Sequence, residues 1–157
     1  MTNTALNMDP LAAALKDKAN LAFVSKDFEG AVGLYNEAVA IDPSAAVLYG
    51  NRAAAYLELK RWEEALTDAS DAVDRDGANA KFHYRRALAL DALERQADAV
   101  AAVNACCELS PTNQRFIELR RDLNRKLTAL TGGVVIDKDD TIAATMRTIR
   151  LYACPFA

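Results

Sequence analysis

A set of small residues that recurs every 34 positions constrains the fold more than any other feature of the sequence. Small residues let two helices approach closely, and Pro or Gly stops a helix and turns the chain. Four such positions recur in phase three times, which is typical of a helix–turn–helix repeat. We therefore predict an all-α fold with repeats at about residues 12–45, 46–79 and 80–113. The sets are Ala19, Ala53 and Ala87; Ala31, Ala65 and Ala99; Ala38, Ala72 and Cys106; and Pro43, Gly77 and Pro111.

The composition agrees with closely packed helices and argues against several other classes of protein. Of 157 residues, 52% are hydrophobic and only 7% are aromatic, and alanine is abundant, which favours helices over sheet. The net charge of -3 argues against binding to nucleic acid. No apolar run is long enough to span a bilayer, and the first ten residues lack the pattern of a secretory signal.

The three cysteines predict neither disulfides nor a metal site. Cys106 and Cys107 are adjacent, Cys154 stands apart, and no second Cys/His pair completes a zinc site. We expect the two adjacent thiols to be buried and inert, and His83 to have a packing or surface role. The sequence therefore predicts no metal and no cofactor, in a protein of the cytoplasm or nucleus.

The residues after the third repeat predict a capping helix and a tail. Apolar residues from Gln114 to Leu130 are spaced three or four apart, opposite a basic face, so this helix would cover the open end of a stack. We divide the chain into an extension (1–11), a repeat domain with its capping helix (12–131) and a poorly ordered tail (132–157).

The tail contains two short sequence patterns. Asp139 to Thr141 could cap a short helix bearing Ile142, Met146 and Ile149. The last four residues, from Cys154 to Ala157, formally fit a prenylation motif, but Pro and Phe are poor fits to its middle pair. We interpret that match as chance and expect no association with membranes.

Polar residues in the first helix of each repeat fall on one stripe. Lys16 and Asn20 are four residues apart, as are Lys81 and Arg85, and Asn51 and Arg85 hold the same position in successive repeats. In a stacked array this stripe lines the concave surface. Basic residues outnumber acidic ones in the first helices, and the reverse holds in the second helices. An acidic chain is thus expected to carry a basic groove that attracts an acidic segment.

Three segments resemble the carboxylate-clamp class of tetratricopeptide repeat domains: Leu15-Lys16-x-x-Ala19-Asn20, Tyr49-Gly50-Asn51-Arg52-Ala53 and Lys81-x-x-Tyr84-Arg85-Arg86-Ala87. Over about residues 12–130 the chain is most similar to the N-terminal domain of the type-five serine/threonine protein phosphatases. The resemblance implies three repeats in a right-handed superhelix with a capping helix, and we expect a monomer. Domains of this class bind the C-terminal Glu-Glu-Val-Asp of the ninety- and seventy-kilodalton heat-shock chaperones.

Carried over by position, the resemblance also implies a role for each site residue. Two cations with neutral amide donors can satisfy two carboxylates without crowding like charges. Glu58 departs from the pattern, because clamp domains often carry Lys or Arg there; it could repel an upstream glutamate, or pair with Lys60 or Lys26. By this resemblance, the main-chain carboxylate of the terminal aspartate would be bound by Lys16, Asn20 and Asn51. Its side-chain carboxylate would be bound by Lys81, and the peptide further upstream by Arg85. The apolar wall against the penultimate valine would be formed by Phe23 and Ala54.

Three functions are compatible with the sequence: a co-chaperone or adaptor that binds chaperone tails, a regulatory segment of a serine/threonine phosphatase, and a general scaffold for an unrelated peptide. The sequence shows no paired carboxylates at a cleft, no phosphate-binding loop and no nucleophile–base pair. We therefore expect this chain not to be an enzyme.

In the first repeat, the apolar stripe of the second helix is predicted to consist of Leu34, Tyr35 and Val39.

Overall fold

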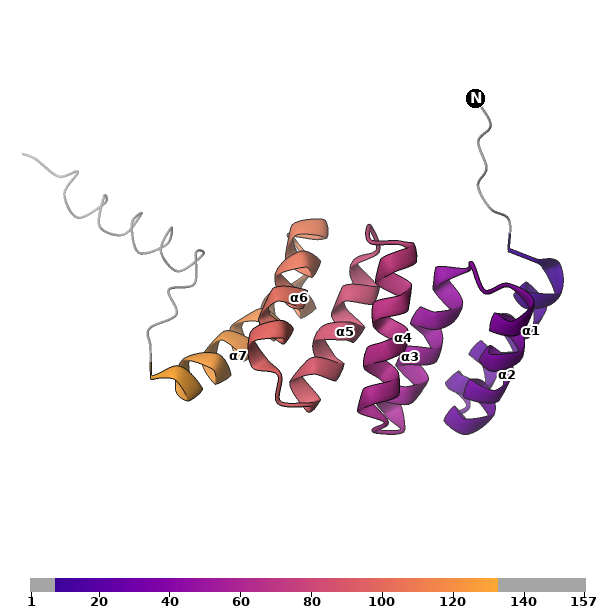
Figure 1. Cartoon of the computed structure of the whole chain (residues 1–157), viewed down its shortest axis with the longest axis horizontal. Coiled ribbons are helices and arrows are strands. Elements are labelled where there is room, and N and C mark those ends of the chain that lie inside the picture. Colours follow the sequence, from indigo (N-terminus) through magenta and orange to yellow (C-terminus); the bar gives the residue numbers. More distant parts are fainter. Residues whose placement is uncertain (1–7, 133–157) are drawn as a thin grey trace, which may run out of the picture.

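The computed structural model describes residues 8–132, which form α-helices joined by short turns (Figure 1). The expected short helix after Asp139 and the motif at Cys154 lie outside the described residues. Within the described part, none of the helices is both long enough and apolar enough to cross a membrane. The helices are α1 (Pro10–Val24), α2 (Phe28–Ile41), α3 (Ala46–Glu58), α4 (Trp62–Arg75), α5 (Ala80–Ala92), α6 (Gln96–Leu109) and α7 (Gln114–Thr131).

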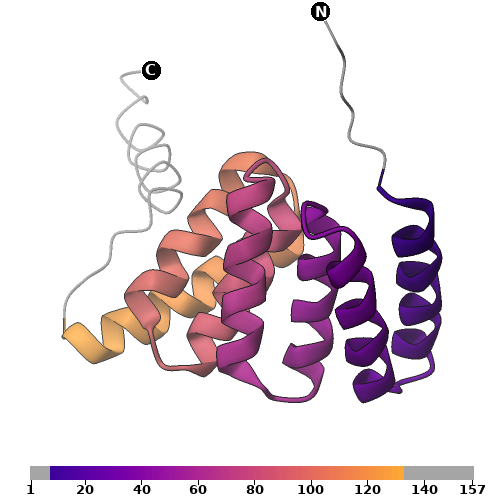
Figure 2. The same ribbon diagram turned by 45° about the vertical axis from the view of Figure 1, so that its right-hand side comes forward.

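The helices pack as three successive hairpins followed by α7. The most extensive contacts lie between α1 and α2, α3 and α4, and α5 and α6. Figures 1 and 2 show the hairpins following one another in chain order, with α1 at one end of the molecule and α7 at the other. Because α3 also contacts both α1 and α5, the first helices of the three repeats lie next to one another. The predicted all-α stack with a capping helix is confirmed.

The recurring alanines lie where helices meet. Ala19, Ala53 and Ala87 have no exposed surface, and the same is true of Ala31, Ala65 and Ala99 on the second helices. A larger side chain at any of these positions would hold the helices apart, and overpacking of this kind costs about 1–3 kcal/mol. The 34-residue period therefore reports close helix–helix contact.

The turns follow the same period. Lys26, Lys60 and Glu94 adopt positive φ angles of 64°, 58° and 58°, and each lies between the first and second helix of its repeat. Second helices end at Ile41, Arg75 and Leu109, two residues before Pro43, Gly77 and Pro111. At the start of the chain, α1 begins at Pro10, two residues before the predicted first repeat. The Asp9 side chain accepts hydrogen bonds from the backbone N–H groups of Leu11 and Ala12, which is a standard N-cap.

A buried ion pair joins the two helices of the second repeat. Arg52 on α3 donates to both carboxylate oxygens of Asp68 on α4, at 2.6 and 2.7 Å. Its remaining nitrogen donates to Asn36 on α2 at 2.8 Å. The side chains of Arg52 and Asp68 are only 15% and 6% exposed, so each charge depends on the other for compensation.

Gly50 lets α5 approach α3 closely. A Cβ atom at this position would overlap the ring of Phe82 and lie 3.1 Å from a guanidinium nitrogen of Arg85. Phe82 is itself 2% exposed and packs against Tyr49, so it has little room to move. Gly33 on α2 offers a contrast, because a Cβ there would meet no atom within 4 Å.

These two glycines give a matched test of the helix packing. Gly33→Ala is expected to raise the free energy of unfolding by about 0.5–1 kcal/mol, because alanine favours the helix more than glycine does. Gly50→Ala gains the same helix propensity but must displace Phe82, so a net loss of about 1–2 kcal/mol is expected. Urea unfolding of both variants measures the difference. An equal stabilisation by both would contradict the close approach of α3 and α5.

Candidate functional site

Five of the seven predicted site residues line one hollow between the first helices of the three repeats. The polar residues among these five come from three helices: Asn20 from α1, Asn51 from α3 and Arg85 from α5. Phe23 and Ala54 supply apolar wall beside them. The hollow has a volume of about 280 Å³ and also includes Val24 and Tyr35.

A second, larger hollow continues from the first toward α7. It has a volume of about 580 Å³ and shares Ala54 and Arg85 with the first, so the two hollows adjoin and are together called the groove below. Lys81, the sixth predicted residue, lies in this part. The second hollow is lined by Ala54, Leu57, Glu58, Lys81, Tyr84, Arg85, Leu88, Asn113, Arg115 and Phe116.

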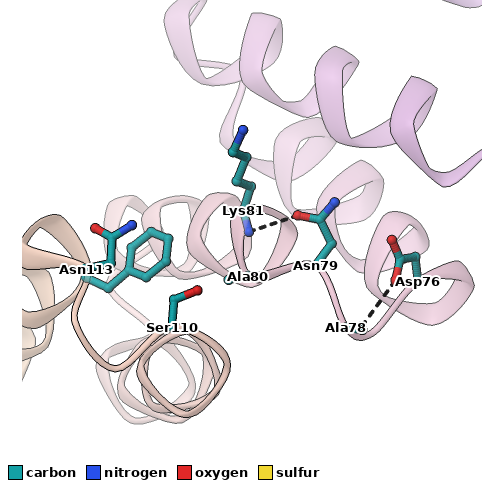
Figure 3. A pocket seen from close by; sticks show the side chains of 8 residues that line it. Asp76, Ala78, Asn79, Ala80, Lys81, Ser110 and Asn113 are labelled. Carbon is teal, nitrogen blue, oxygen red and sulfur yellow. Dashed lines mark hydrogen bonds between the residues drawn. The ribbon is translucent and has the colours of Figure 1, made fainter.

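Lys81 also borders a third hollow of about 380 Å³, at the turns that precede α5 and α7. Figure 3 shows its side chain extending from the start of α5 away from Ser110, while its backbone N–H is held by the Asn79 side chain at 3.1 Å. The polar groups on this side have structural partners already: Asp76 accepts from the backbone of Ala78, and Asn113 caps α7. The third hollow is therefore turn structure, and the Lys81 ammonium belongs to the groove.

Lys16 is the predicted residue that the structure does not bring into the groove. It lies one turn before Asn20 on α1, yet it lines neither hollow. Its ammonium is 3.4 Å from the carboxylate of the neighbouring Asp17, whose side chain is 71% exposed. Exposed pairs of this kind contribute little free energy, so Lys16 can exchange Asp17 for another anion at small cost.

A chain of hydrogen bonds links the polar residues across the repeats. The Asn20 side-chain oxygen accepts from the Tyr35 hydroxyl at 2.6 Å and from the Asn51 amide at 3.3 Å. The Asn51 oxygen in turn accepts from the Arg85 guanidinium at 3.5 Å. Tyr35, which the sequence pattern places only in an apolar stripe, thus reaches the site from α2.

Arg85 is a half-buried cation without an ion-pair partner among residues 8–132. Burial lowers the pKa of its guanidinium. Among residues 8–132, no carboxylate lies within ion-pair distance of Arg85 or of Lys81. Arg52 shows the alternative, since Asp68 compensates its charge fully. A buried charge without a partner is costly, and an anion in the groove removes that cost.

Glu58 is the acidic residue of the groove. It is exposed and lines the second hollow together with Lys81 and Arg85. Of its two expected partners, neither Lys26 nor Lys60 forms an ion pair with it in the part of the chain that the structure describes. Its carboxylate is therefore available to interact with a ligand in the groove.

The capping helix contributes to the groove, although only a capping role is predicted for it. Arg115 and Phe116 in the first turn of α7 line the second hollow. Phe116 lies against Tyr84, with ring centroids 5.3 Å apart. The sequence predicts only that α7 covers the apolar end of the stack, and the structure shows that its first turn also lines the groove. α7 begins 34 residues after α5, and Arg115 and Phe116 hold the positions of Lys81 and Phe82 one repeat earlier, so the 34-residue period extends into this helix.

The histidine and the adjacent cysteines lie in the packed interior. His83 is 8% exposed and its Nε2 is 2.9 Å from the Gly77 carbonyl oxygen. Cys106 and Cys107 are 0% and 7% exposed, and burial raises the pKa of Cys106 to about 12, so its thiol stays protonated. These positions agree with packing roles. Within residues 8–132, no group of three or more potential ligands could hold a metal ion.

Family models described as "Tetratricopeptide repeat" match residues 34–67 in one case, and residues 3–46 and 51–113 in another. The "Protein STIP1 homolog" of Dictyostelium discoideum is 37% identical over 111 residues, which is 71% of this chain and 20% of that protein. The "Serine/threonine-protein phosphatase 5" of Rattus norvegicus is 36% identical over 103 residues, 66% of this chain and 21% of that protein. The expected resemblance to this phosphatase is confirmed, and the chain spans about a fifth of each relative.

Two solved structures place similar domains in complexes with peptides. The "First TPR of Spaghetti (RPAP3) bound to HSP90 peptide SRMEEVD" superposes with a TM-score of 0.75 at 30% identity, covering 79% of this chain and 99% of that one. The second TPR domain of human RPAP3, in complex with the HSP70 peptide SGPTIEEVD, gives a TM-score of 0.70 at 30% identity, covering 72% and 94%. Both peptides end in the same four residues.

Proposed function

Because this chain belongs to the tetratricopeptide repeat family, we propose that it is a non-catalytic adaptor that binds the acidic C-terminal segment of another protein. The preferred ligand is a tail that ends in Glu-Glu-Val-Asp, as in the heat-shock peptides bound by the two similar domains. The observation that carries this proposal is the half-buried Arg85, whose charge no carboxylate among residues 8–132 compensates. We place the interaction in the cytoplasm, where reducing conditions keep Cys106 and Cys107 as thiols.

The chemistry of the groove suits a C-terminal aspartate. Such a residue offers two carboxylates a few ångströms apart, and the groove offers amide and cationic donors from three neighbouring helices. Asn20 and Asn51 donate to the main-chain carboxylate, joined by Lys16 once it leaves Asp17. Lys81 reaches the side-chain carboxylate and Arg85 the upstream backbone. Phe23 and Ala54 contact the penultimate valine.

The expected affinity follows from these contacts. A hydrogen bond to a charged group contributes about 1.5–3 kcal/mol. Several of them, less the cost of ordering a flexible tail, give a dissociation constant on the order of micromolar. The interaction should weaken as salt concentration rises, because charges attract the peptide to the groove.

The free carboxylate is the group to test. A peptide ending in Met-Glu-Glu-Val-Asp should bind with a dissociation constant on the order of micromolar, and the same peptide with a C-terminal amide at least tenfold more weakly, because it lacks one of the two terminal carboxylates. Lys81→Ala should weaken binding of the free acid by a similar factor. Isothermal titration calorimetry measures all of these values.

Lys18→Ala is the matched control for Lys81→Ala. Lys18 is an exposed lysine on α1 that lines neither hollow, so its loss changes the net charge equally without touching the groove. Equal binding of the acid and the amide, or equal losses in the two lysine variants, would refute carboxylate recognition. If Lys81→Ala left binding intact, the chain would be a general scaffold for some other peptide.

A second candidate function follows from the match to serine/threonine-protein phosphatase 5, of which this chain corresponds to only 21%. A domain of this kind can regulate a catalytic domain in the same protein while still binding a tail in the groove. A phosphatase domain encoded in frame with these residues would support this function. A transcript with no such domain would leave the adaptor function alone.

Glu58 sets a further expectation about the ligand. It shares the second hollow with Lys81 and Arg85, where the glutamates that precede the terminal valine and aspartate would lie. Glu58→Gln removes a repulsion and should tighten binding of a Glu-Glu-Val-Asp peptide about two- to threefold, the size of an exposed charge interaction. A Gln-Gln-Val-Asp peptide should show no such gain. Unchanged affinity for the acidic peptide would place Glu58 outside the reach of the ligand.

A further inference from the structure

Tyr35 has the chemistry of a site residue, although it lies beneath the groove on a second helix. Its side chain is 1% exposed, and its hydroxyl donates to the Asn20 oxygen at 2.6 Å. This is the shortest of the hydrogen bonds that connect the polar residues of the groove. Burial raises the pKa of Tyr35, although the charge of Arg85 and the Asn51 amide oppose this, so the hydroxyl remains a donor at neutral pH.

The repeat positions show that the stack itself does not require this hydroxyl. Thirty-four and sixty-eight residues after Asn20 stand Ala54 and Leu88, and at the same distances after Tyr35 stand Ala69 and Val103. The second and third repeats therefore fill both positions with apolar side chains. The polar pair of Asn20 and Tyr35 occurs together in the first repeat, which is the repeat that supplies Asn20 to the groove.

The hydrogen bonds fix which end of each amide faces a ligand. An amide oxygen has two lone pairs, and the Asn20 oxygen uses both, for Tyr35 and for Asn51. The Asn51 oxygen accepts from Arg85. The Asn20 oxygen is thus fully occupied within the protein and the Asn51 oxygen is directed toward Arg85, which leaves mainly N–H groups for a ligand. A carboxylate, which only accepts hydrogen bonds, matches such a surface, whereas a terminal amide brings donors of its own.

From this geometry we infer that Tyr35 is a positioning residue, which holds the Asn20 amide with its NH₂ group toward the ligand and thereby makes the groove selective for a free carboxylate. The inference rests on the proposed function. Without the hydroxyl, only the longer hydrogen bond from Asn51, at 3.3 Å, holds the Asn20 oxygen, so the amide can rotate more easily and present this oxygen to the ligand. That orientation repels a carboxylate but accepts a hydrogen bond from a terminal amide.

Tyr35→Phe tests this inference, with Tyr49→Phe as the matched control. Tyr49 is also buried, at 7% exposure, and its hydroxyl donates to the Pro43 carbonyl at 3.1 Å, away from both hollows. Both variants should stay folded with similar thermal midpoints. Tyr35→Phe should weaken binding of the free-acid peptide about 5- to 10-fold and lower the acid-to-amide preference with it. Tyr49→Phe should leave both unchanged.

A double-mutant cycle with Asn20→Ala shows whether Tyr35 acts through Asn20. If it does, Tyr35→Phe causes no additional loss of affinity once Asn20 is removed. Full affinity and acid preference in Tyr35→Phe, or an equal loss in the Asn20→Ala background, would overturn the inference while the adaptor function stands. A wild-type protein that does not distinguish acid from amide would refute both.

Discussion

Close contact between alanine-lined helices determines where every groove residue lies. Ala19, Ala53 and Ala87 have no exposed surface, and the first helices that carry them are neighbours across the repeats. Asn20 and Asn51 are therefore in hydrogen-bonding contact although 31 residues separate them, and Asn51 meets Arg85 across 34 residues. Larger side chains would move the helices apart, and these contacts would be lost before the fold itself.

Two arginines on the first helices of neighbouring repeats show how the same side chain serves stability in one place and binding in another. Arg52 faces the second helix of its own repeat, where Asp68 and Asn36 satisfy its guanidinium. Arg85 faces the neighbouring first helix, where it donates to an amide oxygen and forms no ion pair with a carboxylate of the described residues. The protein thus tolerates an uncompensated cation at one point, and a ligand carboxylate recovers the free energy that its burial costs.

The sequence predicts the fold well because the 34-residue period depends on helix contact. The same period places Asn20, Asn51, Lys81 and Arg85 in successive first helices, and the structure brings all four into the groove. Periodicity specifies which face of a helix a residue occupies, but not the path of its side chain. Lys16 has the correct position along α1, yet its ammonium lies beside Asp17.

Residues that act across elements were harder to predict. The Tyr35 ring packs as its apolar position suggests, and only the structure shows its hydroxyl bonded to Asn20. The absence of polar residues at the equivalent positions of the other repeats is the signal that could have identified it. Arg115 and Phe116 line the groove from α7 and stand 34 residues after Lys81 and Phe82, so the repeat period could have located them, whereas the apolar and basic faces of α7 alone predict only a capping helix.

The most direct test of a donor-lined groove is an NMR titration of the side-chain nitrogens of Asn20, Asn51 and Arg85 with a peptide that ends in Glu-Glu-Val-Asp. All three signals should shift together and saturate at one dissociation constant, with the N–H protons moving downfield as they bind carboxylate oxygens. Shifts confined to the second helices, or unchanged side-chain signals when the peptide is fully bound, would contradict the account.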